Sequence, residues 1–172
     1  MPEVQDVANY FLSLNPTRDG LTHSKLQLLC AYAQGMSLAL LDRPLFPEPL
    51  EARAEEPVIA ALAEKYAPQG EKVLPGSGLA VQQARQPFDD EQKFILELVW
   101  NYYGDSSVHA LRRRSSCDFP ADYGSGETIT PQTIKDAFKK NPVVLKLKNL
   151  SQDQLVDDPL VPEADIRLVL GG

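Results

Sequence analysis

The segment LTHSKLQLLCAYAQGMSLALLDRPLFPEP, residues 21–49, decides the fold that we predict for this chain. Thr22 is a helix-start residue, and about five turns with an apolar side follow it. The helix is expected to end at Asp42, because Pro44 lacks the backbone N–H that a continuing helix needs. A helix so clearly delimited is predicted to be a central element of the hydrophobic core.

An extended segment, residues 44–52, follows this helix and contains three prolines. Because proline cannot donate a ladder hydrogen bond, we predict an edge strand or an extended strap and not a central strand. Gln27 and Gln34 on the helix are expected to tie it to this strap through hydrogen bonds. Phe46 and Glu48 on the strap are candidates for contact with a partner, and core packing is the alternative for Phe46.

Further helices are predicted from apolar residues spaced three and four apart and from capping residues. Residues 72–86 are expected to form a loop with one short strand, and residues 115–126 a polar loop. Residues 143–147 are left open between a strand and an apolar patch. The other predicted helices span residues 4–12, 57–66 with Pro57 at the first position, 90–103, 108–113 and 131–138.

The chain has 172 residues, of which 43% are hydrophobic, and this suffices for one domain with a core. We predict a mainly α fold, a single helical domain with a small β-hairpin or extended strap packed on it. The domain is expected to span residues 1–140. The composition shifts after Asn141, so residues 141–172 are assigned as a C-terminal extension of uncertain structure.

The formal net charge is −7, with 24 acidic and 17 basic residues. Binding to a phosphate backbone needs a basic footprint, so nucleic acid is not expected as a partner. Neither a membrane-spanning stretch nor a secretory signal is found, so a cytoplasmic protein is expected. The two cysteines give no disulfide or zinc framework. Cys30 is predicted to be a small core residue, and Cys117 is predicted to lie in a polar loop.

Residues suited to catalysis do not form a recognisable set. Neither His23 nor His109 has a cysteine or carboxylate at metal-ligand spacing, so no metal or cofactor is predicted. The chain lacks the GxSxG pattern of a nucleophile elbow, and no catalytic residue is assigned. The acidic residues at 55–56 and 89–91 lie at the N-termini of predicted helices, where the helix dipole accounts for them. An enzyme with an unrecognised site near the two histidines and these carboxylates is the alternative to a binding protein.

One basic run, Arg112-Arg113-Arg114, closes the predicted helix 108–113. It is either a solvated helix terminus or a contact for an acidic partner, because arginine binds carboxylates through a planar fork of donors. The candidate partner-binding residues are Arg112, Arg113, Arg114, Phe46, Glu48 and Arg53.

The helix that begins at Thr22 and the strap that follows it resemble the signature of the SocA-like, or Panacea-domain, family. The resemblance covers roughly residues 4–140 and is strongest in the first block. That block comprises LTHSKLQLL (21–29), YAQG (32–35), PLF (44–46) and EPLEA (48–52). Weaker similarities are VANYF (7–11), FDDE (88–91), VWNYYG (99–104) and TIT (128–130).

The chain departs from the family pattern at three places. Arg53 stands where the family has tryptophan, Glu56-Pro57 where it has Gly-Pro, and residues 113–122 replace its later Thr-His and Pro-Trp pairs. If those positions contact the partner, this chain has a different partner or binding mode.

The resemblance implies a bacterial or phage protein of the antitoxin type, which binds a cognate protein toxin. The antitoxin would either sequester the toxin or present it to the ClpXP protease, and the resemblance carries over no catalytic residue. The alternative is a phage- or secretion-associated effector or regulator on the same fold that acts on a host protein.

Overall fold

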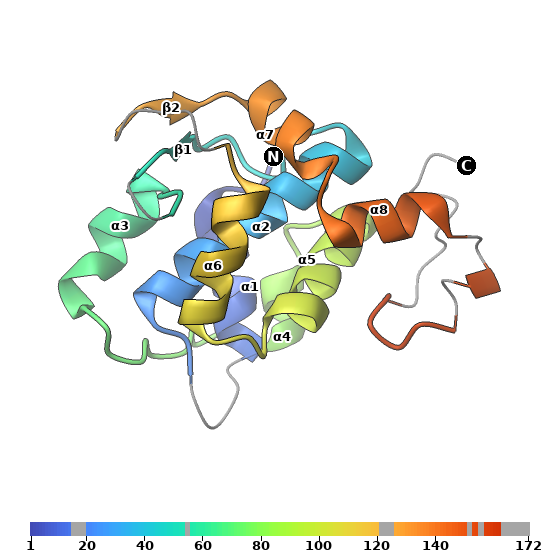
Figure 1. The fold of residues 1–172 in the computed structure, drawn as a ribbon. Helices are drawn as coiled ribbons and strands as arrows, with labels where there is room; N and C mark the ends of the chain where they lie inside the picture. Colours follow the sequence, from blue (N-terminus) through green and yellow to red (C-terminus); the bar gives the residue numbers. More distant parts are fainter. Residues whose placement is uncertain (15–19, 54–55, 121–125, 151–152, 155–156, 163–172) are drawn as a thin grey trace.

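The computed structural model describes residues 1–14, 20–53, 56–120, 126–150, 153–154 and 157–162, which are mostly helical (Figure 1). The predicted mainly α domain with a small β element is confirmed. Within the described residues, the elements run in the order α1 (Val4–Leu14), α2 (His23–Leu41), β1 (Leu50–Glu51), α3 (Ala60–Tyr66), the 3₁₀ turn η1 (Ala67–Gln69), α4 (Val81–Arg85), α5 (Asp90–Tyr103), α6 (Val108–Asp118), β2 (Thr128–Ile129), α7 (Pro131–Phe138) and α8 (Pro142–Asn149).

Helix α2 is the centre of the fold, as its sequence predicts. Thr22 caps it by accepting a hydrogen bond from the Lys25 N–H, and Asp42 ends it in the left-handed conformation with φ of 57°. All residues from Ser24 to Leu40 are buried, and α1, α5, α6 and α7 pack around the helix (Figure 1). A helix buried on every side is typical of the core of a protein.

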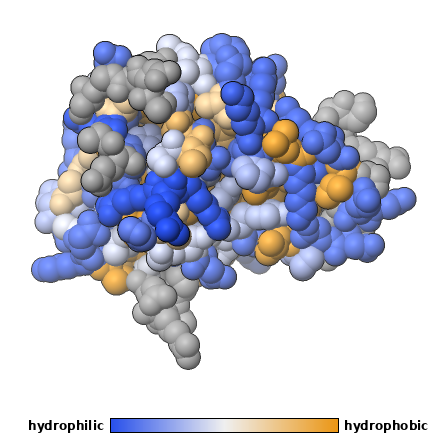
Figure 2. All heavy atoms as spheres, viewed as in Figure 1, coloured by the Kyte–Doolittle hydropathy of each residue, from blue (hydrophilic) through white to orange (hydrophobic). Residues whose placement is uncertain are grey.

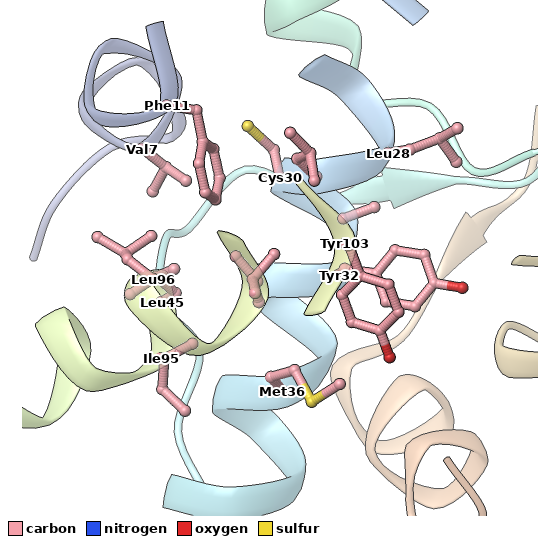
Figure 3. Packing of buried hydrophobic residues seen from close by; sticks show 14 of the residues in the cluster. Val7, Phe11, Leu28, Cys30, Tyr32, Met36, Leu45, Ile95, Leu96 and Tyr103 are labelled. Carbon is pink, nitrogen blue, oxygen red and sulfur yellow. The ribbon is translucent and has the colours of Figure 1, made fainter. Parts of the chain in front are cut away.

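The small residues of α2 let neighbouring elements approach closely. A Cβ atom at Gly35 would lie only 2.4 Å from the ring of Phe138 on α7. Phe11 of α1 and Ile95 of α5 belong to the hydrophobic core around α2 (Figure 3). Cys30 is fully buried among these apolar side chains, which confirms its predicted role, and burial raises the pKa of its thiol.

Two glutamine side chains of α2 hold the segment that follows. Gln34 accepts hydrogen bonds from the Leu45 and Phe46 N–H groups at 2.7 and 3.3 Å, and it donates to the Phe46 carbonyl at 2.9 Å. Gln27 accepts from the Ile59 N–H at 2.9 Å and donates to its carbonyl at 3.0 Å. The predicted tie between helix and strap is confirmed for Gln34, whereas Gln27 reaches beyond the strap to the start of α3.

The strap ends in the small sheet of the fold. Its β1 pairs antiparallel with β2, with Leu50 opposite Ile129 and Glu51 opposite Thr128. The two strands lie far apart in sequence, so they form a long-range pair and not the predicted hairpin. On its other side Glu51 exchanges backbone hydrogen bonds with Val58.

One helix prediction and one loop prediction before α5 need correction. Helix α3 begins at Ala60 and not at Pro57, because Val58 pairs with Glu51 and the amide of Gln27 binds the backbone of Ile59. Residues 72–86 contain the short helix α4 in addition to the predicted loop. Val73 forms a single bridge with Thr22, which accounts for the strand character expected there.

Helix α6 is longer than the sequence indicated. It continues to Asp118, so Cys117 lies exposed on a helix and the predicted loop location is wrong. Of the predicted polar loop, residues 121–125 lie outside the described residues.

Residues 142–149 form α8, which corrects the strand proposed for 143–147. Asn141 caps this helix through its side chain, which accepts from the Val143 and Val144 N–H groups. Val143, Val144 and Leu147 are buried in the same core as α2. Residues 163–172 of the assigned C-terminal extension lie outside the described residues.

No helix in the described ranges combines the length and apolar character that a membrane span requires.

Candidate partner-binding surface

Helix α6 has one face turned to the core and one to solvent. Leu111, Ser115 and Asp118, which follow each other at helical spacing, are buried. Arg113 and Cys117 lie on the opposite, exposed side. We define the α6 surface as this outer side of the helix with the adjoining segment before α3, namely Arg53, Glu56, Arg112, Arg113 and Arg114.

A buried polar contact fixes the inner face of α6 to α2. The hydroxyl of Tyr32 donates to Asp118 Oδ2 at 2.6 Å, and its ring stacks on Tyr103 with centroids 4.4 Å apart. Asn141 in turn donates to the Tyr103 hydroxyl at 3.3 Å. Burial, and then the hydrogen bond to Asp118, raise the pKa of Tyr32. The phenol therefore stays a neutral donor, and the helix is held from inside.

Arg112 joins three parts of the chain at the edge of the α6 surface. Its Nε donates to Glu56 Oε2 at 2.9 Å, and its Nη2 donates to Ser24 Oγ at 3.2 Å. The Ser24 hydroxyl donates to Glu71 Oε1 at 2.9 Å. Arg112 is thus engaged within the fold, and it holds the segment before α3 against α6 and the start of α2.

Arg113 and Arg114 are exposed. Figure 2, drawn in the orientation of Figure 1, shows strongly hydrophilic side chains gathered over α6. The Arg114 guanidinium lies 5.9 Å from the ring centroid of Tyr103, at the range of a cation–π contact. Among the described residues neither arginine forms an ion pair.

The fourth predicted arginine position, Arg53, directly follows the strap. Its guanidinium pairs with Glu51 at 3.1 Å, and its side chain is 49% exposed. The neighbouring Ala52 carbonyl accepts from the Gly126 N–H at 2.6 Å. The strap end therefore lies beside Gly126, shortly before β2, although the two are far apart in sequence.

Two predicted contact residues do not belong to this surface. Phe46 is fully buried, so its assignment to partner binding is wrong and the alternative, core packing, is what the fold requires. Glu48 is half-buried and accepts a hydrogen bond from the Val4 N–H at 3.0 Å. Its carboxylate therefore caps the start of α1.

The two histidines have different surroundings. His23 is the first residue of α2, and its Nε2 lies 3.2 Å from Nε2 of Gln27. Partial burial lowers its pKa, and the carboxylates of Glu71 and Glu56 oppose this effect. His109 is exposed on α6. Across the described ranges, no three or more His, Cys, Asp or Glu side chains are grouped so as to hold a metal ion.

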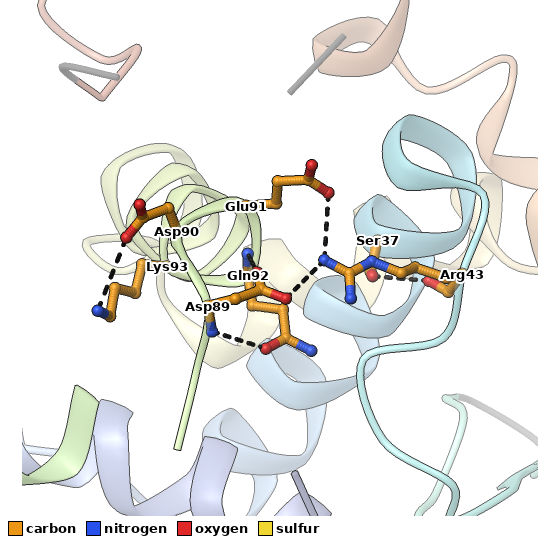
Figure 4. A network of polar contacts seen from close by, with 7 residues as sticks. All are labelled: Ser37, Arg43, Asp89, Asp90, Glu91, Gln92 and Lys93. Carbon is orange, nitrogen blue, oxygen red and sulfur yellow. Dashed lines mark hydrogen bonds and ion pairs between the residues drawn. The ribbon is translucent and has the colours of Figure 1, made fainter. Parts of the chain in front are cut away.

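The acidic run before α5 caps its helix, as predicted. Asp89 Oδ1 accepts from the Gln92 N–H at 2.9 Å, and Gln92 Oε1 accepts from the Asp89 N–H at 3.0 Å. Arg43 bridges Asp89 at 2.8 Å and Glu91 at 3.1 Å (Figure 4). Although partial burial opposes it, the hydrogen bonds from Gln92 and Arg43 lower the pKa of Asp89. These carboxylates therefore have structural roles at the helix start.

Sequence reasoning missed the residues that support the α6 surface. The sequence predicts a loop at Asp118, because Leu111 is the one apolar residue among the three buried residues of α6. The spacing of Leu111, Ser115 and Asp118 was the one available signal, and it is weak without knowledge of the Tyr32 donor. Nothing in the sequence joins Ser24 to Glu71, because the two residues lie on separate elements.

Comparisons with protein-family models, with curated proteins and with solved structures found no match to this chain. The resemblance to the SocA-like family rests on the quoted sequence blocks and stays a prediction. Several residues of the first block have defined structural roles. Gln27 and Gln34 bind the backbone of the following segment, Tyr32 holds α6, and Gly35 admits the ring of Phe138.

Proposed function

We propose that this protein is a binding module of the antitoxin type, which neutralises a cognate protein toxin by direct contact through the α6 surface. The resemblance of the first sequence block to the SocA-like family supplies the class of function. The α6 surface supplies a place for the contact, because it presents cations on a chain of net charge −7.

The observation that carries the proposal is where the departures from the family pattern lie in space. Glu56 lies far from residue 113 in sequence, yet its carboxylate binds Arg112, the residue next to Arg113. The matched block, in contrast, serves the scaffold through Gln34 and its contacts with the strap. Two of the departures from the family pattern, Glu56 and Arg113, therefore meet at the α6 surface, which is expected if this chain binds a different partner on the same scaffold.

The physical character of the surface also favours protein binding. Arginine is enriched among the residues that dominate the energy of protein interfaces. Helix α6 is capped by Ser107 and held from inside by Tyr32, so its backbone is ordered before a partner arrives. A preorganised surface loses little conformational entropy on binding.

The proposal is tested by co-expressing the tagged protein with the product of the adjacent gene and following both co-purification and growth. A stoichiometric complex together with rescue of growth supports it. The variant R113E/R114E is expected to lose both effects, whereas K140E/K148E, which reverses two exposed lysines on the turn after α7 and on α8, should keep them. Absence of both complex and rescue with the natural sequence would refute the antitoxin function and favour an effector that acts on a host protein.

Sequestration and proteolytic delivery are separated by one further measurement. The half-life of the bound toxin is compared in cells with and without the ClpX unfoldase. Delivery predicts that the toxin is degraded only when both this protein and the unfoldase are present. Sequestration predicts a toxin that is stable in the complex in both strains.

A further inference from the structure

We infer that the α6 surface recognises an acidic segment of its protein partner, through carboxylates that bind Arg113 and Arg114. The inference rests on the proposed function, because it names the chemistry of the partner at the same surface. Its evidence is the balance of charges on the α6 surface, the way the two arginines are presented, and the charge of the whole chain.

The charges of the α6 surface do not cancel. Arg53 is paired with Glu51 and Arg112 with Glu56. The one acidic residue of α6 is Asp118, which is buried and accepts from Tyr32. In the part of the chain that the structure describes, Arg113 and Arg114 have no carboxylate partner, so two cations of this surface are available to a ligand.

The backbone presents these two cations in a defined place. Ser107 Oγ accepts from the Ala110 N–H at 3.1 Å and caps α6, and the buried Asp118 ties down its last turn. The Arg114 guanidinium rests near the ring of Tyr103. Arg113 and Arg114 are consecutive on the helix, so their side chains leave it about 100° apart, Arg113 on the outer side and Arg114 on the flank beside Tyr103. Their planar guanidinium groups are suited to bidentate hydrogen bonds with carboxylates.

The overall charge favours an acidic protein segment over a nucleic acid. A phosphate backbone is a long row of charges, and binding it requires a correspondingly extended basic surface. The chain has 24 acidic and 17 basic residues, so a long polyanion that extends beyond α6 meets net repulsion. A short acidic segment contacts α6 alone and avoids that repulsion.

The experiment is an NMR titration of the isotope-labelled full chain with a short peptide of alternating Glu and Ala. Its matched control is the same peptide with Gln in place of Glu. We expect saturable shifts of the amides of residues 108–118 with the Glu peptide, and none with the Gln peptide. Affinity should be weak, on the order of millimolar, and should fall as ionic strength rises from about 0.01 M to about 1 M, where the Debye length shrinks from about 30 Å to about 3 Å.

Two double variants that alter the net charge by the same amount test whether the peptide binds at α6. R113E/R114E is expected to bind the Glu peptide at least about tenfold more weakly, because each reversal replaces an attraction by a repulsion. K140E/K148E should bind within about twofold of the natural sequence. The neutral R113Q/R114Q should give an intermediate affinity, and unchanged amide shifts outside α6 establish that each variant is folded.

Several outcomes would overturn the inference. These are shifts spread over all basic residues, equal loss of binding in the two charge-reversal variants, or tighter binding of a short DNA duplex than of the Glu peptide. The test is independent of the toxin experiment. A toxin complex that forms while the peptide fails to bind removes the acidic-segment inference alone, and peptide binding without any toxin complex removes the antitoxin function alone.

Discussion

Replacement of Gln34 by methionine is expected to destabilise the fold strongly. The Gln34 side chain is 4% exposed and makes three hydrogen bonds to the strap backbone, at Leu45 and Phe46. Methionine has a similar length and an apolar end, so it fills the space and forms none of these bonds. Two N–H groups and one carbonyl would then be buried without the partner they have now.

The expected loss follows from these three groups. A buried polar group left unsatisfied costs about 1–3 kcal/mol, so the lower end of this range gives about 3 kcal/mol in all. Domains of this kind have free energies of unfolding of about 5–15 kcal/mol, so the loss is a large fraction of the total. It corresponds to a fall of roughly 6–12 °C in the melting temperature for a chain of this length.

The assay is urea unfolding at neutral pH, followed by the fluorescence of Trp100, the single tryptophan of the chain. Trp100 is partly buried and stacks on Phe11 with ring centroids 6.1 Å apart, so its emission reports on the core. The control is Gln132→Met on the exposed face of α7, which should change stability by less than about 0.5 kcal/mol. A loss below about 1 kcal/mol for Gln34→Met would refute the reasoning that this amide holds the strap.

Two further predictions concern the core. Gly35→Ala places a Cβ 2.4 Å from the ring of Phe138. Overpacking costs about 1–3 kcal/mol and the higher helix propensity of alanine returns about 1 kcal/mol, so we expect stability to fall by a net of about 1 kcal/mol. Thermal unfolding measures this change. The loss should shrink in a Phe138→Leu background, and a stabilised Gly35→Ala protein would contradict the close packing. Burial raises the pKa of Tyr10 and of Tyr103 to about 12. The unfolded chain therefore releases these protons first. The contribution of the two tyrosines to the free energy of unfolding is constant below about pH 10 and falls between about pH 10 and about pH 12, by roughly 1.4 kcal/mol per pH unit for each tyrosine. Urea unfolding across this range measures the slope, and unchanged stability up to pH 12 would contradict it.

Local signals in the sequence predicted the starts of the principal helices. Thr22, Asp89 and Thr130 each accept a backbone hydrogen bond from the residue three positions on, as expected of a cap. Such contacts join residues three positions apart, so they can be predicted from the sequence alone. The length and apolar character of α2 likewise predict the centre of the core, and the predicted tie to the strap backbone is confirmed for Gln34.

The remaining elements depend on contacts between distant residues. Helix α3 begins late because Val58 pairs with Glu51, and a proline at the expected first position gives no hint of that pair. Helix α6 extends to Asp118 because Tyr32 of α2 supplies the donor that a buried carboxylate needs. A polar inner face of this kind has no hydrophobic period that sequence reasoning can detect.

The candidate site was predictable in part. The arginine run is visible in the sequence, but its division into one engaged and two exposed residues requires the position of Glu56. The sequence leaves Phe46 open between partner contact and core packing. The structure decides for the core, because Gln34 binds the backbone N–H and carbonyl of Phe46 and the ring is fully buried.

Hydrogen exchange on the complex with the adjacent-gene product tests the central claim most directly, because it maps the contact without any substitution. Binding through the α6 surface predicts slower exchange in peptides that cover residues 108–118 and 50–53, and unchanged exchange in peptides that cover α8. Protection of α8 or α1 with α6 unchanged would contradict the claim that α6 is the binding surface of this protein.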